Sequence, residues 1–172
     1  IAKPGSEKVV RDSLGDSDPG VRLEAATVIG NMPDAAKQYA QQLCDMATSD
    51  GDSSVREEAW KALQSALPWL APQQLQALAD RFNSRDGLPR RILILQALKS
   101  QLLKAQRMDE LASTDQSLAD ALLLIGDYSA AAQEYAQALQ YRKDRNDSAQ
   151  MISNLRDRRL EALCPALHSL AV

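Results

Sequence analysis

The stretch Asp16-Ser-Asp-Pro-Gly-Val-Arg-Leu-Glu-Ala-Ala-Thr-Val-Ile-Gly30 decides the fold, because a second copy follows it. That copy reads Asp50-Gly-Asp-Ser-Ser-Val-Arg-Glu-Glu-Ala59. The valine and arginine after the turn recur 34 residues later, as Val55 and Arg56. A recurrence of this length is typical of stacked helical repeats.

Each copy predicts a polar turn followed by a helix with one apolar face. Aspartate and serine oxygens in the turn can accept from the free amides of a new helix. Pro19 suits the first helical position, which needs no N–H donor. Apolar residues then follow at i, i+4, i+7 and i+8, which places them on one face. They are Val21, Ala25, Val28 and Ile29 in the first copy and Val55, Ala59, Ala62 and Leu63 in the second.

The pattern D-x-D-P-x-V-R-x-x-A resembles the second helix of a HEAT repeat. This resemblance implies a structural ladder in which arginines bond to aspartates of adjacent turns. The ladder residues would be Asp16, Asp18, Arg22, Asp50, Asp52 and Arg56. A third unit keeps the spacing but reads Leu-Pro-Arg-Arg-Ile at 88–92. We therefore expect HEAT-like helices over residues 6–103, and Arg22 and Arg56 should each contact an acid.

A second pattern resembles one tetratricopeptide (TPR) repeat over residues 112–143. It runs Leu118-Ala-x-x-Leu, then Ile125-Gly-Asp-Tyr-x-x-Ala-Ala-x-x-Tyr135-x-x-Ala-Leu. The resemblance implies a helical hairpin that turns at Gly126. It departs from the family at Asp115, where a large apolar residue is usual, and at Lys143, which replaces a closing proline. A capping helix over 147–163 completes a TPR-like region of 112–167. Its expected inward residues are Met151, Ile152, Leu155 and Leu160.

The predicted fold is all-α: a right-handed α-solenoid of antiparallel helix pairs, in a single helical-repeat domain of residues 1–172. The chain has 172 residues, 45% hydrophobic and 4% aromatic, and alanine and leucine dominate a core suited to packed helices. Trp60 and Trp69 are expected to fill gaps between helix pairs. Val9 should face inward, and the helix containing 92–95 should be covered on more than one side.

Composition restricts the function classes. A net charge of −3 disfavours nucleic-acid binding, and no apolar run is long enough for a membrane span. Cys44 and Cys164 are interpreted as buried thiols in a reducing setting, with a disulfide left open. The chain begins at Ile1 without methionine or a signal peptide, so a processed protein or an excised piece stays open. Cytoplasm is the default compartment, and an exported fragment is the alternative.

No motif predicts catalysis, a cofactor or a metal site. The Asp50 turn resembles a calcium loop, but Val55 and Lys61 occupy the positions that need glycine and glutamate. His168 is the only histidine, which disfavours a zinc site and a Ser/His or Cys/His pair. There is no phosphate-binding glycine loop.

The predicted function is a non-catalytic protein–protein interaction or scaffold module. The TPR resemblance implies a groove lined by Ser113, Gln116, Ser117, Asp120, Leu123 and Leu124. We select Ser117, Asp120, Leu123 and Leu124 as partner-binding candidates. The two leucines either contact an amphipathic helix or, as we favour, pack against preceding helices. Groove positions that clamp a peptide carboxylate in TPR proteins carry asparagine, lysine or arginine, and none occurs here.

Arg156 and Arg159 are a second candidate surface. Residues 1–52 carry five basic and nine acidic side chains, whereas residues 140–172 carry six basic and four acidic. Two interpretations stand: a solvated end cap, which we favour, or a surface for an acidic partner such as the N-terminal part of a second copy.

Two further alternatives concern the function of the whole chain. It could be an architectural segment of a larger protein or enzyme assembly, or an enzyme similar to the HEAT-like bilin lyases by fold analogy alone.

Overall fold

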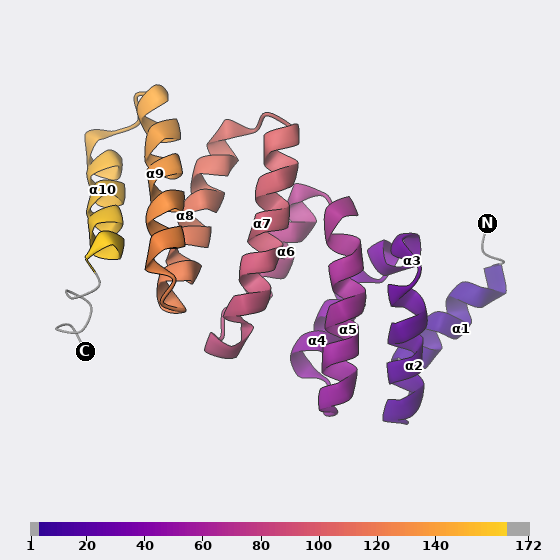
Figure 1. The fold of residues 1–172 in the computed structure, drawn as a ribbon. Coiled ribbons are helices and arrows are strands. Elements are labelled where there is room, and N and C mark those ends of the chain that lie inside the picture. The colour runs from indigo at the N-terminus through magenta and orange to yellow at the C-terminus, as the bar shows by residue number, and fades with distance from the viewer. Residues whose placement is uncertain (1–3, 165–172) are drawn as a thin grey trace. The chain divides into compact units, whose positions relative to one another are not determined.

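A computed structural model describes residues 4–164, with side chains from Val9 onward, and this part of the chain is helical without a strand (Figure 1). It contains ten α-helices and two short 3-10 helices. The chain divides into two compact units, residues 1–70 and residues 71–172. His168 lies outside the described residues.

Unit 1 contains five α-helices and one 3-10 helix: α1 (Pro4–Leu14), α2 (Pro19–Gly30), α3 (Pro33–Gln38), α4 (Ala40–Ser49), α5 (Ser53–Ala66) and η1 (Leu67–Trp69). The predicted caps are present, because Asp18 accepts from the Gly20 amide and Asp52 accepts from the Ser54 and Val55 amides. The backbone leaves helical geometry at Tyr39 (φ −99°, ψ 13°), so α3 and α4 are separate helices, and each contacts α5.

The crossing of α2 and α5 is the centre of unit 1. A Cβ atom added to Gly30 would lie 3.1 Å from both Cα and Cβ of Ala62, so no larger residue fits without a shift. Ala62 shares its helix face with Val55 and Ala59, and all three are buried. Val28, the counterpart of Ala62, is instead 45% exposed. The two copies therefore share their pattern but not their environment.

Unit 2 contains α6 (Pro72–Arg81), η2 (Arg85–Gly87), α7 (Leu88–Lys104), α8 (Met108–Leu124), α9 (Tyr128–Asp144) and α10 (Ala149–Leu163). Consecutive α-helices contact one another in chain order (Figure 1). α7 ends at Lys104, and the chain turns at Gln106 with φ 55° before α8 begins at Met108.

The hairpin expected around Gly126 is present. Gly126 has φ 85°, a conformation that favours glycine, and Asp127 caps α9 by accepting from the Ala130 amide. Ala119 and Ala131 are fully buried where α8 meets α9, and Tyr135 is also buried. The assignment of this hairpin to the TPR family stays a prediction, as do the handedness, the antiparallel pairing and the single domain.

Several burial predictions were wrong, and most concern the first and last helices. Val9 on α1 is 64% exposed, and Leu160 and Met151 on α10 are 53% and 41% exposed. Helical spacing identifies an apolar stripe, but burial also requires a neighbouring helix to cover it. Trp69 in η1 is 63% exposed, although Trp60 is buried as expected.

The predicted burial holds for one of the two cysteines and for most of the apolar run in α7. Cys44 is buried as predicted, whereas Cys164 is exposed at the end of α10, and the two form no disulfide. In α7, Ile92, Ile94 and Leu95 are buried while Leu93 is 41% exposed, so the helix is covered over most of its circumference.

The buried alanines at the helix crossings give the first prediction. Ala59→Leu and Ala131→Leu should each lower the free energy of unfolding by about 1–3 kcal/mol, because the added atoms have no space. Urea denaturation of the full chain measures this. Ala77→Leu, at an exposed position of α6, is the matched control and should leave stability nearly unchanged. Equal stability of all three variants would show that the helix faces are misassigned.

Candidate functional site

A groove of unit 2 lies between α6 and α8, and we call it the first groove. It encloses about 770 Å³. Its floor is apolar and consists of Leu98 and Leu102 from α7, which are almost completely buried. Its walls are polar: Gln73, Gln76 and Asp80 from α6, and Asp109, Glu110, Ser113, Thr114 and Ser117 from α8.

The walls of the first groove offer mostly hydrogen-bond acceptors. Thr114 Oγ1 donates to the Glu110 carbonyl at 2.8 Å, and Ser117 Oγ donates to the Ser113 carbonyl at 3.0 Å. Their hydroxyl protons are therefore used, while their lone pairs face outward as acceptors. Asp80 accepts from Gln76 Nε2 at 3.0 Å and forms no ion pair with any residue in the described range.

Two arginines next to the first groove hold the acids at the start of α8. Arg107 Nε donates to Glu110 at 2.7 Å, and Arg145 forms an ion pair with Asp109.

A second groove of about 650 Å³ involves α8, α9 and α10 and is lined by Gln116, Arg142, Met151, Asn154, Leu155, Asp157, Arg158 and Glu161. Arg142 connects the two grooves, because it lines the second and donates to Ser113 Oγ of the first at 3.3 Å; Asp147 holds the same guanidinium at 3.1 Å.

The predicted partner-binding residues do not form one site. Ser117 lines the first groove. Asp120 lies instead at the α8–α9 contact, where the hydroxyl of Tyr135 donates to it. Burial, followed by this bond to Asp120, raises the pKa of Tyr135. Leu123 is half-buried. Leu124 is 68% exposed beside a smaller cavity that Leu88 also lines, so the expected packing of Leu124 against preceding helices is largely absent.

Arg156 and Arg159 are exposed on α10 and line neither groove. Neither arginine has an ion-pair partner between residues 9 and 164. Arg158 pairs with Glu161 at 3.4 Å. The choice between a solvated end cap and a surface for an acidic partner therefore stays a prediction.

The ladder of unit 1 contains one full rung. Arg22 donates to both carboxylate oxygens of Asp50 at 2.8 Å, and to the main-chain carbonyls of Asp16 and Ser17 at 2.8 and 3.1 Å. The hydrogen bond from Arg22 lowers the pKa of Asp50 in spite of burial, and the same bond raises the pKa of Arg22.

Arg56 also contacts Asp50, but it donates to the main-chain carbonyl at 2.6 Å and pairs with no carboxylate in the described part, so it forms no second full rung. The position 34 residues after Asp50 is Ser84, which has no carboxylate to offer. Asp18 and Asp52 serve as helix caps. Helix capping therefore explains why the turn that begins at Asp50 is acidic, and no bound calcium ion is needed to account for it.

A buried charge cluster joins α7, α8 and α9, and sequence reasoning missed it. Lys99 Nζ lies 3.0 Å from Asp115, forms an ion pair with Glu134, and donates to Gln137 at 2.9 Å. Asp115 is fully buried, and neither of its oxygens accepts a hydrogen bond. The signal was available: Asp115 lies on the buried face of α8 with Ala112 and Leu118, where a charge needs a partner.

Burial sets the protonation behaviour of this cluster. Burial raises the pKa of Asp115 to about 6, although Lys99 opposes the shift. Burial also lowers the pKa of Lys99, but Glu134 and Asp115 outweigh it and the net shift is upward. Perturbed groups often mark active sites, but Asp115 is fully buried, and burial itself explains the shift.

The described residues contain no group of three His, Cys, Asp or Glu side chains that could hold a metal ion. In the same part of the chain, no helix is long and apolar enough to cross a membrane.

The 34-residue recurrence, the capped turns and the Arg22–Asp50 rung define a protein built from stacked α-helical repeats. A family model of HEAT repeats matches residues 2–99, more than half of the chain, and the chain belongs to this family. The match agrees with the HEAT-like region expected over 6–103, and the helical architecture fits an α-solenoid. Comparisons with curated proteins and with solved structures gave no match.

The Arg22 rung gives the second prediction. Arg22→Ala should lower the melting temperature more than Arg56→Ala, because Arg22 loses a bidentate bond to Asp50 and Arg56 only one main-chain bond. The folded pKa of Asp50 is below its unfolded value of about 4. Its stabilising contribution is therefore present above that pH and is lost as pH falls through the folded pKa. The gap between wild type and Arg22→Ala should shrink in this acidic range, and a pH-independent gap would contradict the assignment.

The buried Asp115 gives a third prediction, in which the contribution to stability changes with pH in the direction opposite to that of Asp50. Its folded pKa of about 6 exceeds its unfolded value of about 4, so its contribution to stability is largest below pH 4 and is lost as pH rises through 6. Asp115→Asn removes this titration. Urea denaturation should therefore show the variant gaining stability relative to wild type between pH 4.5 and pH 7. A constant difference across this interval would mean that Asp115 does not titrate there.

Proposed function

We propose that this chain is a non-catalytic protein-interaction module and that a peptide segment of its partner binds in the first groove. HEAT repeats are typical of interaction scaffolds, and the family is generally non-catalytic. The observation that carries the proposal is the first groove itself: an almost buried apolar floor, acceptor-rich walls and a volume of about 770 Å³. A groove of this size holds several side chains.

The chemistry of the groove selects a class of ligand. Leu98 and Leu102 favour an apolar anchor, because burying it removes apolar area from water. Around this floor, Asp80, Glu110 and the Ser and Thr lone pairs accept hydrogen bonds, and none of the groove's lining residues is basic. The ligand class is therefore a peptide with an apolar residue flanked by lysine or arginine. The arginines beside the groove already bond to its acids and to Ser113, so a free carboxylate would compete with those bonds.

A peptide library displayed on phage and selected on the immobilised full chain tests this proposal. Enriched peptides should carry an apolar residue with basic neighbours. A synthetic copy of an enriched peptide should bind the wild type and fail to bind Ser117→Arg, which fills the groove and adds a positive charge. Ser129→Arg is the matched control, because Ser129 is exposed on α9 and lines neither groove, and it should bind like wild type.

Asp80→Lys should weaken the same peptide without destabilising the chain, since Asp80 is exposed. Failure to enrich any peptide contradicts the proposed function. Equal binding by Ser117→Arg and wild type would move the binding site away from the first groove.

A further inference from the structure

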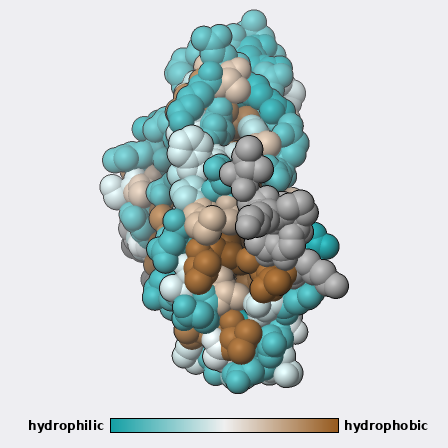
Figure 2. All heavy atoms as spheres, turned by 90° about the vertical axis from the view of Figure 1, so that its right-hand side faces the viewer, coloured by the Kyte–Doolittle hydropathy of each residue, from teal (hydrophilic) through white to brown (hydrophobic). Residues whose placement is uncertain are grey.

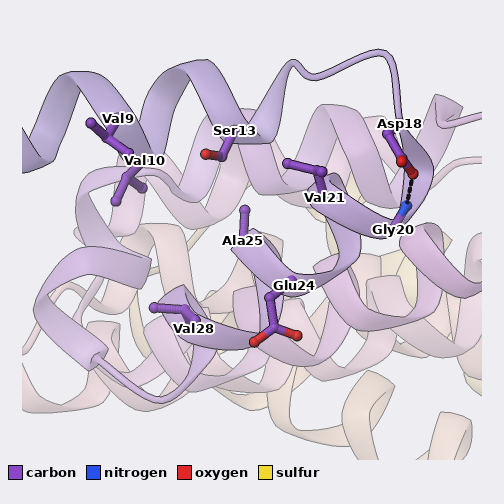
Figure 3. Close-up of a pocket in the computed structure, with 9 residues that line it drawn as sticks. All are labelled: Val9, Val10, Ser13, Asp18, Gly20, Val21, Glu24, Ala25 and Val28. Atoms are coloured by element: carbon purple, nitrogen blue, oxygen red, sulfur yellow. Dashed lines mark hydrogen bonds between the residues drawn. The ribbon is translucent and has the colours of Figure 1, made fainter.

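Unit 1 has an apolar groove between α1 and α2 that the proposed function does not use. Val9 and Val10 of α1 and Val21, Ala25 and Val28 of α2 line a space of about 460 Å³ (Figure 3). Val9, Val21 and Val28 are 64%, 39% and 45% exposed. Figure 2 shows hydrophobic side chains gathered at this end of the unit. We call this surface the N-terminal face.

The internal repeat shows what kind of element fits the N-terminal face. Adding 34 residues to Val21, Ala25 and Val28 gives Val55, Ala59 and Ala62, which are 0%, 0% and 2% exposed. Those counterparts are buried where α2 packs on α5, with Gly30 against Ala62. The N-terminal face is therefore the same kind of helix-packing surface, and no helix among residues 9–164 covers it as α2 covers α5.

The repeat also specifies a charge on the covering helix. In the α2–α5 contact, Arg22 of the covering helix binds Asp50 in the turn before α5. The counterpart of Asp50 is Asp16, which accepts a hydrogen bond from the Asp18 amide at 2.8 Å, as Asp50 does from the Asp52 amide. Asp16 has no ion-pair partner in the described part of the chain. A helix that covers the N-terminal face should therefore bring an arginine beside apolar residues.

Helix α10 carries arginines beside apolar residues on an exposed face. In α10, Arg156, Arg159, Leu160 and Leu163 fall within about 100° of arc, since each residue advances a helix by about 100°. Leu160 and Leu163 are 53% and 55% exposed, and the two arginines are exposed without an ion-pair partner between residues 9 and 164. Leu155 and Ala162 anchor α10 through another side. We call these four residues the α10 stripe.

We propose that the N-terminal face binds the α10 stripe of a second copy of this chain, in head-to-tail association. The stripe offers leucines to Val21 and Val28 and arginines to Asp16, Asp18 and Glu24. The two ends of the chain carry net charges of opposite sign. Residues 1–52 contain nine acidic and five basic residues, and residues 140–172 contain six basic and four acidic residues. Pairing two N-terminal faces would instead oppose Glu24 and Asp18 of both copies, which like-charge repulsion disfavours.

Head-to-tail contacts are heterologous, so each copy keeps one free face after it binds. The weight-average mass of the full chain in light scattering should therefore rise above 18.8 kDa with concentration at low salt. It should fall back as salt increases, because ions screen exposed charges. Val21→Lys/Val28→Lys should remove association through the N-terminal face, and Arg156→Glu/Arg159→Glu should remove it through the α10 stripe.

Mixing the two variants is the decisive measurement. Each variant alone should stay monomeric, whereas the mixture should form a 1:1 dimer, because each partner supplies the face that the other lacks. Circular dichroism confirms folding, and all four changed positions are exposed. Arg158→Glu and Leu103→Lys are matched controls on α10 and α7 and should associate like wild type.

Three outcomes would overturn the proposal. A wild type that stays monomeric at every concentration and salt excludes this association. Association that survives either double substitution excludes the corresponding face. A mixture that stays monomeric, after both variants have lost association, excludes head-to-tail contact. None of these results bears on peptide binding in the first groove, which lies in unit 2 and is measured separately.

Discussion

The close approach of α2 to α5 is the constraint on which unit 1 depends. Gly30 and Ala62 meet so closely that one added carbon would lie 3.1 Å from the opposite helix. Small residues at this crossing let the helices bury their apolar faces against each other. Arg22 then fixes the turns, because its guanidinium bonds two main-chain carbonyls of its own turn and the carboxylate of the next. Packing supplies the stability, and the rung supplies the register between repeats.

Unit 2 uses a buried charge where unit 1 uses small side chains. Asp115 stands at the interface of α7, α8 and α9, and Lys99 reaches it from the neighbouring helix. Such a pair contributes little net stability, because burial of both charges costs about as much as their attraction returns. Its effect is on specificity: a shifted α8 would leave Asp115 without its cation, so the pair disfavours other registers of these three helices.

Local features were predictable from sequence, whereas burial at the ends and between elements was not. The capping aspartates, the turn at Gly126 and the arginine of the rung act over a few residues or through an exact repeat, so their spacing reveals them. Val28 and Ala62 occupy equivalent positions, yet one is 45% and the other 2% exposed, because only Ala62 has a helix above it. Leu160 was misjudged for the same reason. The first groove needs α6 and α8 to lie beside each other, and Lys99 meets Asp115 only after three helices assemble.

The same sequence pattern therefore has two consequences in one chain. Inside unit 1 it yields a buried contact, and at α1 and α2 it yields an apolar face next to Asp16, which has no ion-pair partner in the described part of the chain. An outer face of a repeat protein that meets only water is usually polar. The apolar residues of this face are instead those of the pattern that builds the interior. The first groove differs in origin, since polar side chains of α6 and α8 create it and no repeat position requires them. Substitutions of its exposed wall residues, unlike those of Leu98 and Leu102 in its floor, should thus change binding without changing the packing of the helices.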